Sequence, residues 1–195
     1  MGRIFYLMGK SSTGKDTIYK SLMADKTLAL KPVVLYTTRP VRAGETEGVE
    51  YHFTDEAELE KVRESGKLIE ERAYDTCLGI WHYFTVDDGQ IDLEHSDYLM
   101  IGTLQSYQRS RNYFGKERVV PVLIELEDGI RLQRALDRER QQEHPRYDEM
   151  CRRFLADSED FSEKRLREAG VARSFINDNL EDCLAEIRAY IEEVK

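Results

Sequence analysis

The stretch MGKSSTGKDT, residues 8–17, carries the strongest structural signal in this chain. It follows a short apolar run and opens a segment whose apolar residues have helical spacing. Gly9, Gly14 and Lys15 fit the pattern G-x-x-x-x-G-K, in which a glycine-rich turn points backbone N–H groups at phosphate oxygens. A buried strand before the turn and a helix after it are the context that such a phosphate-binding loop requires. We therefore predict a working nucleotide site here.

The residues after the second glycine carry the charges of this site. Lys15 is expected to reach the β and γ phosphates, and Thr17 to hydrogen-bond a phosphate. Asp16 occupies the position where such loops usually have Ser or Thr. Its carboxylate would repel a phosphate unless a Mg²⁺ ion lies between them, and that ion takes oxygen ligands from both. The alternative is an acidic residue stabilised by the helix dipole. The expected ATP-binding residues are Gly9, Ser11, Ser12, Thr13, Gly14, Lys15, Asp16 and Thr17.

Composition indicates one folded, acidic domain. The 195 residues are 41% hydrophobic and carry a net charge of −9, which argues against a nucleic-acid partner. The first residues hold too short an apolar run for a signal peptide or a membrane span, so no membrane partner is expected. The chain has three cysteines and no CxxC pair, which predicts reduced thiols in a cytoplasmic protein; they are Cys77, Cys151 and Cys183. The protein is expected to be a monomer or a homodimer.

Strand and helix signals alternate along the chain, which predicts a parallel sheet covered by helices on both faces. Strands are expected at 3–8, 32–36, 97–103, 118–126 and 172–178, and in a small sheet at 67–73 and 79–86. Helices are expected at 14–25, 55–66, 104–115, 128–156 with a break at Pro145, and 179–195, with a short helix and loop in 87–96.

The segment YTTRPVRAGETEGVEYHF, residues 36–53, resembles the guanylate kinase signature T-T-R-x-x-R-x-G-E-x-x-G-x-x-Y-x-F. The matching positions are Thr37, Thr38, Arg39, Arg42, Gly44, Glu45, Gly48, Tyr51 and Phe53. A weaker resemblance extends over nearly the whole chain. It implies that Arg39, Arg42 and Tyr51 hold the phosphate of an acceptor nucleotide. Two guanidinium groups and a phenol on a glycine-containing loop suit phosphate recognition independently of the family.

The resemblance implies an α/β P-loop kinase: a central parallel sheet flanked by helices, a small acceptor-binding α+β insertion and a helical lid. The single domain, 1–195, then divides into a core (1–34, 86–130 and 157–195), an acceptor-binding region (35–85) and a lid (131–156).

The lid stretch is rich in arginine, and in the resembling family lid arginines clamp the donor phosphates. Arg138, Arg140, Arg152 and Arg153 are the candidates by position, and Arg138 and Arg153 are taken as catalytic. The alternative for each is a solvated ion pair with a neighbouring acid. Asn177, at the end of the last expected strand, matches a family position near the donor adenine.

The base pocket matches the family less well. Glu70 matches the carboxylate that reads guanine, but apolar or weaker residues stand at other pocket positions, namely Leu35, Leu78, Ile101 and Thr103. Thr103 still offers a hydroxyl to a base. A related enzyme, ribose 1,5-bisphosphate phosphokinase, shares the fold and also has Asp after the lysine, and its acceptor has no base.

The prediction is therefore a guanylate-kinase-like transferase of purine nucleotide metabolism that moves the γ-phosphate of ATP, with Mg²⁺, to GMP. Its catalytic residues are expected to be Lys15, Arg39, Arg42, Arg138 and Arg153, and its acceptor-binding residues Arg39, Arg42, Tyr51, Glu70 and Thr103. Two alternatives stay open: another phosphorylated acceptor, such as ribose 1,5-bisphosphate or another nucleoside monophosphate, and a non-catalytic protein-binding module.

Overall fold

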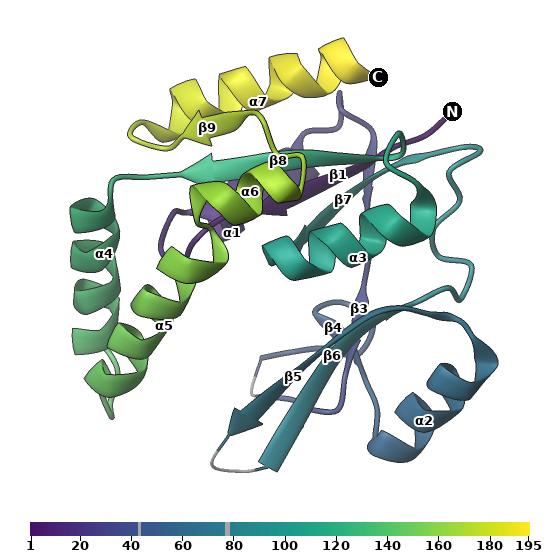
Figure 1. Ribbon diagram of the computed structural model, residues 1–195, viewed down its shortest axis with the longest axis horizontal. Coiled ribbons are helices and arrows are strands. Elements are labelled where there is room, and N and C mark those ends of the chain that lie inside the picture. The colour runs from purple at the N-terminus through teal and green to yellow at the C-terminus, as the bar shows by residue number, and fades with distance from the viewer. Residues whose placement is uncertain (43, 77–78) are drawn as a thin grey trace.

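The computed structural model describes residues 1–42, 44–76 and 79–195 of the chain (Figure 1). Within these residues, the central sheet has five parallel strands in the order β2-β7-β1-β8-β9. They are β1 (Ile4–Met8), β2 (Leu30–Pro32), β7 (Asp97–Gly102), β8 (Val119–Glu125) and β9 (Ser174–Ile176). The predicted parallel sheet flanked by helices is confirmed.

Helices cover both faces of this sheet (Figure 1). Successive side chains of β1 point to opposite faces, and every one of them is fully buried. Phe5 and Leu7 pack with α1 (Lys15–Ala24) and α7 (Leu180–Val194). Tyr6 packs on the other face with α3 (Leu104–Phe114). The phosphate loop and the start of α3 both lie at the carboxyl edge of the sheet, where ligands bind in open α/β folds.

A second, smaller sheet lies beside the core, with strand order β4-β3-β6-β5 (Figure 1). Its strands are β3 (Leu35–Thr37), β4 (Tyr51–Phe53), β5 (Leu68–Thr76) and β6 (Gly79–Val86), and α2 (Glu56–Ser65) packs against it. Together they form the predicted α+β insertion.

The strand expected at 32–36 is wrong, because its residues belong to two sheets. β2 ends at Pro32, which has no N–H to donate, and β3 begins at Leu35. Between them the Gln90 side chain accepts from the Val34 N–H (2.8 Å) and donates to its carbonyl (3.2 Å). The chain therefore crosses from the core to the small sheet without a strand partner at Val34.

The short helix expected in 87–96 is absent, since these described residues form turns. The carboxylates of Asp88 and Asp92 accept from the N–H groups of Gln90 (3.0 Å) and Glu94 (3.0 Å), two residues further on. Such local side-chain bonds satisfy the backbone in turns and compete with helix.

The lid consists of α4 (Asp128–Arg140) and α5 (Tyr147–Asp160), with the predicted break between them (Figure 1). α5 continues past the expected lid boundary at residue 156, and a further helix, α6 (Glu163–Glu168), follows. Cys151 and Cys183 are free thiols, whereas Cys77 lies outside the described residues. Among the described helices, none combines the length and apolar character needed to cross a bilayer.

Candidate active site

The phosphate loop between β1 and α1 is a tight turn that only glycine fits at two positions. Gly14 has φ +89°, and a Cβ there would lie 2.4 Å from Nδ2 of Asn177. A Cβ on Gly9 would lie 2.4 Å from the carbonyl oxygen of Ile124 on β8. Inside the loop the Thr13 hydroxyl donates to the Lys10 carbonyl (2.9 Å). The loop therefore curls closely against the ends of β8 and β9.

Asn177 braces this loop from the end of β9. The side chain is buried, and its Nδ2 donates to the Thr13 carbonyl over 2.7 Å. Its Oδ1 and the Oγ of Ser12 are buried without a hydrogen-bond partner in the described part of the chain. The structure thus places Asn177 against the loop backbone. Its predicted contact with adenine stays a prediction.

Lys15 begins α1, and its ammonium group lies in a largely desolvated place. Burial lowers the pKa of Lys15, and the charges of Arg138 and Arg131 act in the same direction. The carboxylates of Asp16 and Asp157 oppose this shift in the pKa. An ammonium group with few water partners is suited to bind an anion, because phosphate oxygens replace the lost hydration.

The sequence prediction missed Arg131 on α4, whose side chain is only 1% exposed. Its Nε donates to the Ser11 carbonyl (3.0 Å), and its guanidinium also pairs with Asp128 and with Asp157 (3.3 Å). The Ser11 N–H donates to the same Asp157 carboxylate over 2.6 Å. Both backbone groups of Ser11 are therefore held by the lid helices.

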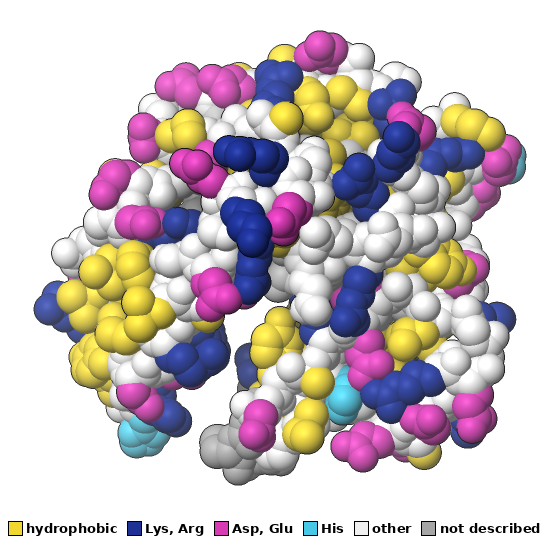
Figure 2. Space-filling model, in the orientation of Figure 1, with side chains coloured by type: hydrophobic (Ala, Val, Ile, Leu, Met, Phe, Trp, Pro, Cys, Tyr) yellow, Lys and Arg dark blue, Asp and Glu magenta, His cyan; other side chains and the backbone are white. Residues whose placement is uncertain are grey.

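The lid and the phosphate loop enclose a pocket of about 490 Å³. Its lining includes Ser11, Ser12, Arg138 and Arg153, so two of the predicted lid arginines do face the loop region. Arg153 is held by Glu149 (2.8 Å), whereas Arg138 has no ion pair within the described residues. Figure 2 shows the surface hollowed between the lid and the β5–β6 hairpin, with Lys and Arg side chains beside the gap.

The other two predicted lid arginines are engaged in ion pairs. Arg152 pairs with Glu149 (2.7 Å), and the two neighbouring arginines lower the pKa of this carboxyl to about 2. Arg140 pairs with Asp137 at 3.6 Å. Both are exposed, as the alternative of solvated ion pairs predicts.

One face of the small sheet carries a cluster of arginines and aromatic side chains, which we call the acceptor face. The β5–β6 register places Glu70 opposite Thr85, Arg72 opposite Tyr83, and Tyr74 opposite Trp81. The acceptor face consists of these six residues and of Arg39, Arg42 and Tyr51, which contact them.

Arg39 lies inside the acceptor face and is only 3% exposed. It forms two 2.8 Å bonds with the Glu45 carboxylate, and it also donates to Pro40 O (2.9 Å) and Tyr83 Oη (3.1 Å). Its guanidinium carbon lies 5.3 Å from the Tyr51 ring centroid. Since these bonds use four of its five N–H groups, Arg39 can bind an acceptor phosphate only by exchanging a present partner.

Arg42 is the more accessible of the two predicted acceptor arginines. It is exposed, and its guanidinium carbon lies 5.9 Å from the Trp81 ring centroid. Among the described residues its side chain has no ion pair, while its backbone N–H donates to Glu45 (2.8 Å). A stacked guanidinium with free N–H groups can bind phosphate without losing other bonds.

The position expected to read the base is buried and already paired. The Glu70 side chain is fully buried and accepts from the Thr85 hydroxyl (2.9 Å) and from Arg72 (3.1 and 3.3 Å). Thr103 caps α3, where its hydroxyl accepts from the Ser106 N–H (3.2 Å). Leu35 is buried, Ile101 is partly buried, and Leu78 lies outside the described residues.

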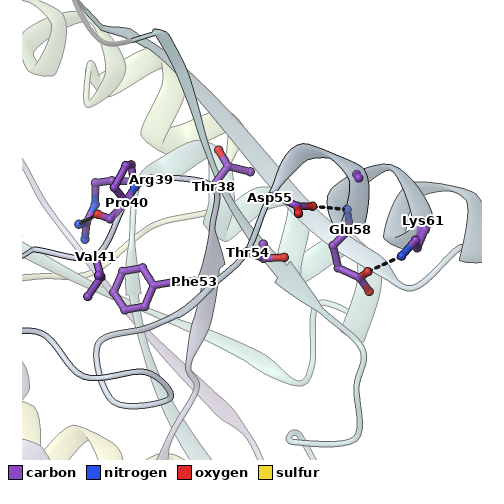
Figure 3. Close-up of a pocket in the computed structure, with 10 residues that line it drawn as sticks. Thr38, Arg39, Pro40, Val41, Phe53, Thr54, Asp55, Glu58 and Lys61 are labelled. Carbon is purple, nitrogen blue, oxygen red and sulfur yellow. Dashed lines mark hydrogen bonds and ion pairs between the residues drawn. The ribbon is translucent and has the colours of Figure 1, made fainter.

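A larger hollow of about 660 Å³ lies between loop residues 38–41 and the start of α2 (Figure 3). Figure 3 shows Arg39 on the far side of the loop from α2. The Asp55 carboxylate accepts from the Glu58 N–H (2.8 Å), and Glu58 pairs with Lys61 (2.9 Å). Because the helix N-terminus and the lysine are both engaged, this hollow is a poor anion site.

Comparisons with known proteins agree with this arrangement. The family model for guanylate kinase matches residues 1–79. The Chromohalobacter salexigens guanylate kinase is 34% identical over 79 residues, covering 40% of this chain and 36% of that protein. The Thermobifida fusca guanylate kinase is 41% identical over 68 residues, covering 35% of this chain and 34% of that protein. The Aliivibrio fischeri guanylate kinase is 31% identical over 93 residues, covering 45% of each chain.

The matched segments span less than half the length of these curated relatives. The residues matched by the family model hold the phosphate loop and the signature segment. The crystal structure of guanylate kinase from Anaplasma phagocytophilum is similar over 98% of this chain and 85% of that one. Its TM-score is 0.69 and its sequence identity 18%. The resemblance is therefore confirmed in sequence for the first two fifths of the chain, and in fold for nearly all of it.

Proposed function

Because residues 1–79 match guanylate kinases in sequence and the whole chain has their fold, we propose that this protein phosphorylates GMP with ATP, giving GDP and ADP. The observation that carries the proposal is the pairing of two anion-binding surfaces. One is the phosphate loop with partly buried Lys15, and the other is the acceptor face with accessible Arg42. A triphosphate on the first and a monophosphate on the second would meet end to end.

The chemistry needs little beyond positioning and charge neutralisation. The attacking group is a phosphate oxygen of the acceptor, which is already ionised, so no general base is required. Lys15 would bind the transferring phosphoryl group, and Arg42 would hold the acceptor phosphate with Tyr51. Arg138, which has no ion pair in the described part of the chain, would reach the transferring group as the lid closes and excludes water.

The donor set suits Mg²⁺ bound mainly by the substrate. Across the described residues, no group of three His, Cys, Asp or Glu side chains could hold a metal. Mg²⁺ commonly uses one or two carboxylates together with substrate phosphates, and Asp16 is exposed in the first turn of α1 beside the loop. The ion would neutralise charge that develops on the phosphates. Asp16→Asn is expected to raise the Mg²⁺ concentration needed for half-maximal rate.

The non-catalytic module is the weaker alternative, because the phosphate loop is intact at Gly9, Gly14 and Lys15. A base-free acceptor such as ribose 1,5-bisphosphate would use the same chemistry. We further propose that the protein acts in cytoplasmic purine nucleotide metabolism with small molecules as its partners. Whether it is a monomer or a homodimer stays a prediction.

The decisive experiment measures ADP release from ATP and Mg²⁺ with GMP, dGMP, AMP, UMP, CMP and ribose 1,5-bisphosphate offered separately. We expect GMP or dGMP to be the best acceptor. Lys15→Ala should abolish transfer to every acceptor, whereas Arg42→Ala should mainly raise the KM for the acceptor. Quenching of Trp81, the single tryptophan, gives acceptor binding directly. Preference for another acceptor, or equal mild effects of both changes, would contradict the proposal.

A further inference from the structure

Arg72 places a buried cation beside the carboxylate expected to read the acceptor base. The Arg72 side chain is 12% exposed and the Glu70 side chain 0% exposed. Nε and one terminal nitrogen of Arg72 donate to the two Glu70 oxygens at 3.1 and 3.3 Å. Both residues lie on the acceptor face, opposite Thr85 and Tyr83 on β6.

This pair leaves donors free on the arginine. A guanidinium has five N–H groups, and Glu70 takes two of them. Within the described ranges, the remaining N–H groups of Arg72 have no partner. A largely buried donor without a partner is costly, so a ligand or water completes its bonds in the working protein. Arg72 can therefore present N–H groups to whatever occupies the acceptor face.

The pair also limits the number of further hydrogen bonds that the Glu70 carboxylate can accept. A carboxylate has about four acceptor positions, and Arg72 and Thr85 use three of them here. Glu70 also acts on buried Tyr6 of β1, whose pKa is raised first by burial and then by this carboxylate. One acceptor position of Glu70 is left for a further N–H, not the two that the parallel bonds of a full guanine edge need. Because the carboxylate is 0% exposed, the base reaches this position only when the side chains that cover it move.

We propose that Arg72 is a specificity-determining residue that donates to the C6 carbonyl oxygen of a purine while Glu70 accepts from the ring N1–H. The inference rests on the proposed function and names its substrate class, the 6-oxopurine monophosphates. Adenine presents an amino group at C6, so two donors would face each other and AMP is rejected. Because Glu70 has one free position, the 2-amino group adds little, and IMP is accepted nearly as well as GMP.

Arg63 on α2 supplies a matched control, because it pairs with Glu71, the β5 residue between Glu70 and Arg72. It pairs with Glu71 and Glu60, and it is 37% exposed. Like Arg72 it pairs with a β5 carboxylate, but it reaches that carboxylate from α2 and is no part of the acceptor face. Loss of Arg63 removes a surface ion pair, and loss of Arg72 removes the donor to the base.

The test compares kcat and KM for GMP, IMP and AMP in the unchanged protein, Arg72→Met, Arg72→Lys and Arg63→Met. The unchanged protein should use IMP within about 10-fold of GMP, since only the 2-amino group differs. Arg72→Met should lower the GMP to AMP ratio of kcat/KM by about 100-fold or more, mostly through KM for GMP. Arg72→Lys keeps a charge for Glu70 but loses the planar fork, so it should also lose much of this ratio.

Four results distinguish the possible failures. If GMP is the best acceptor but the GMP to AMP ratio is unchanged in Arg72→Met and Arg72→Lys, the role of Arg72 is wrong and the proposed function stands. A strong preference for GMP over IMP in the unchanged protein would also overturn the inference. If ribose 1,5-bisphosphate is used and no 6-oxopurine monophosphate is, both the proposed function and the inference fail. Equal loss in Arg63→Met would assign the effect to the sheet instead.

Discussion

Replacing Gly14 by alanine should destabilise the protein through both backbone strain and a steric clash. Comparison with the same change at Gly66 separates the two effects. Gly14 and Gly66 have similar left-handed backbone conformations. The φ and ψ angles are +89° and 10° at Gly14, and +71° and 9° at Gly66. An alanine at either position carries the strain of this conformation, about 1–2 kcal/mol. A Cβ on Gly66 would meet nothing within 4 Å, whereas a Cβ on Gly14 would lie 2.4 Å from Asn177 Nδ2.

The clash at Gly14 has a cost that can be estimated from the bond it breaks. Asn177 must move away from the new methyl group, and its 2.7 Å bond to the Thr13 carbonyl is then lost. Leaving buried polar groups unpaired costs about 1–3 kcal/mol. Gly14→Ala should therefore destabilise the protein by about 2–5 kcal/mol, and Gly66→Ala by about 1–2 kcal/mol.

Equilibrium unfolding in urea measures both values, with and without ATP and Mg²⁺. Gly66→Ala should keep the stabilisation that ATP confers, whereas Gly14→Ala should lose it, because the loop can no longer close around phosphate. In an Asn177→Ala background the clash is relieved, so the effect of Gly14→Ala should fall toward that of Gly66→Ala. Equal destabilisation by the two glycine changes, or strict additivity with Asn177→Ala, would refute this reasoning.

The remaining predictions concern the lid, the acceptor loop and the thiols. Arg131→Met should lower the free energy of unfolding by about 1–3 kcal/mol, because it leaves the Ser11 carbonyl and the partly buried Asp157 carboxylate without this partner. Exposed Arg140→Met should change it by under about 0.5 kcal/mol in the same urea assay. The Arg39 guanidinium lowers the pKa of Glu45 to about 2 in the folded protein, against an ordinary value of 4.5. The Glu45 contribution to stability is thus present above pH 4.5 and lost as the pH falls toward 2, and Glu45→Gln should flatten this part of the pH–stability curve. Burial raises the pKa of Cys183 to about 11, so peptide mapping after thiol alkylation at pH 8 should find exposed Cys151 labelled first and Cys183 labelled only on unfolding.

Much of the site could be predicted because its signals are local. The spacing of Gly9, Gly14 and Lys15 encodes the turn and the start of α1, which depend on backbone geometry within a few residues. The apolar stripe of the last helix likewise predicts α7 and its buried face. The expected strand at 32–36 failed, because its apolar run does not reveal that the Gln90 side chain would satisfy Val34.

Local sequence patterns were therefore enough to predict the phosphate loop, the alternation of strands and helices, and the arginines expected to bind the acceptor. The three-dimensional fold sets how these charges are paired. It buried Arg131 against the phosphate loop, bound Arg39 to Glu45, left Arg42 accessible, and set Arg72 beside Glu70. Arginines look alike in a sequence, because each can be solvated or paired. Which state each one adopts depends on neighbours that folding brings together across the sheets and the lid.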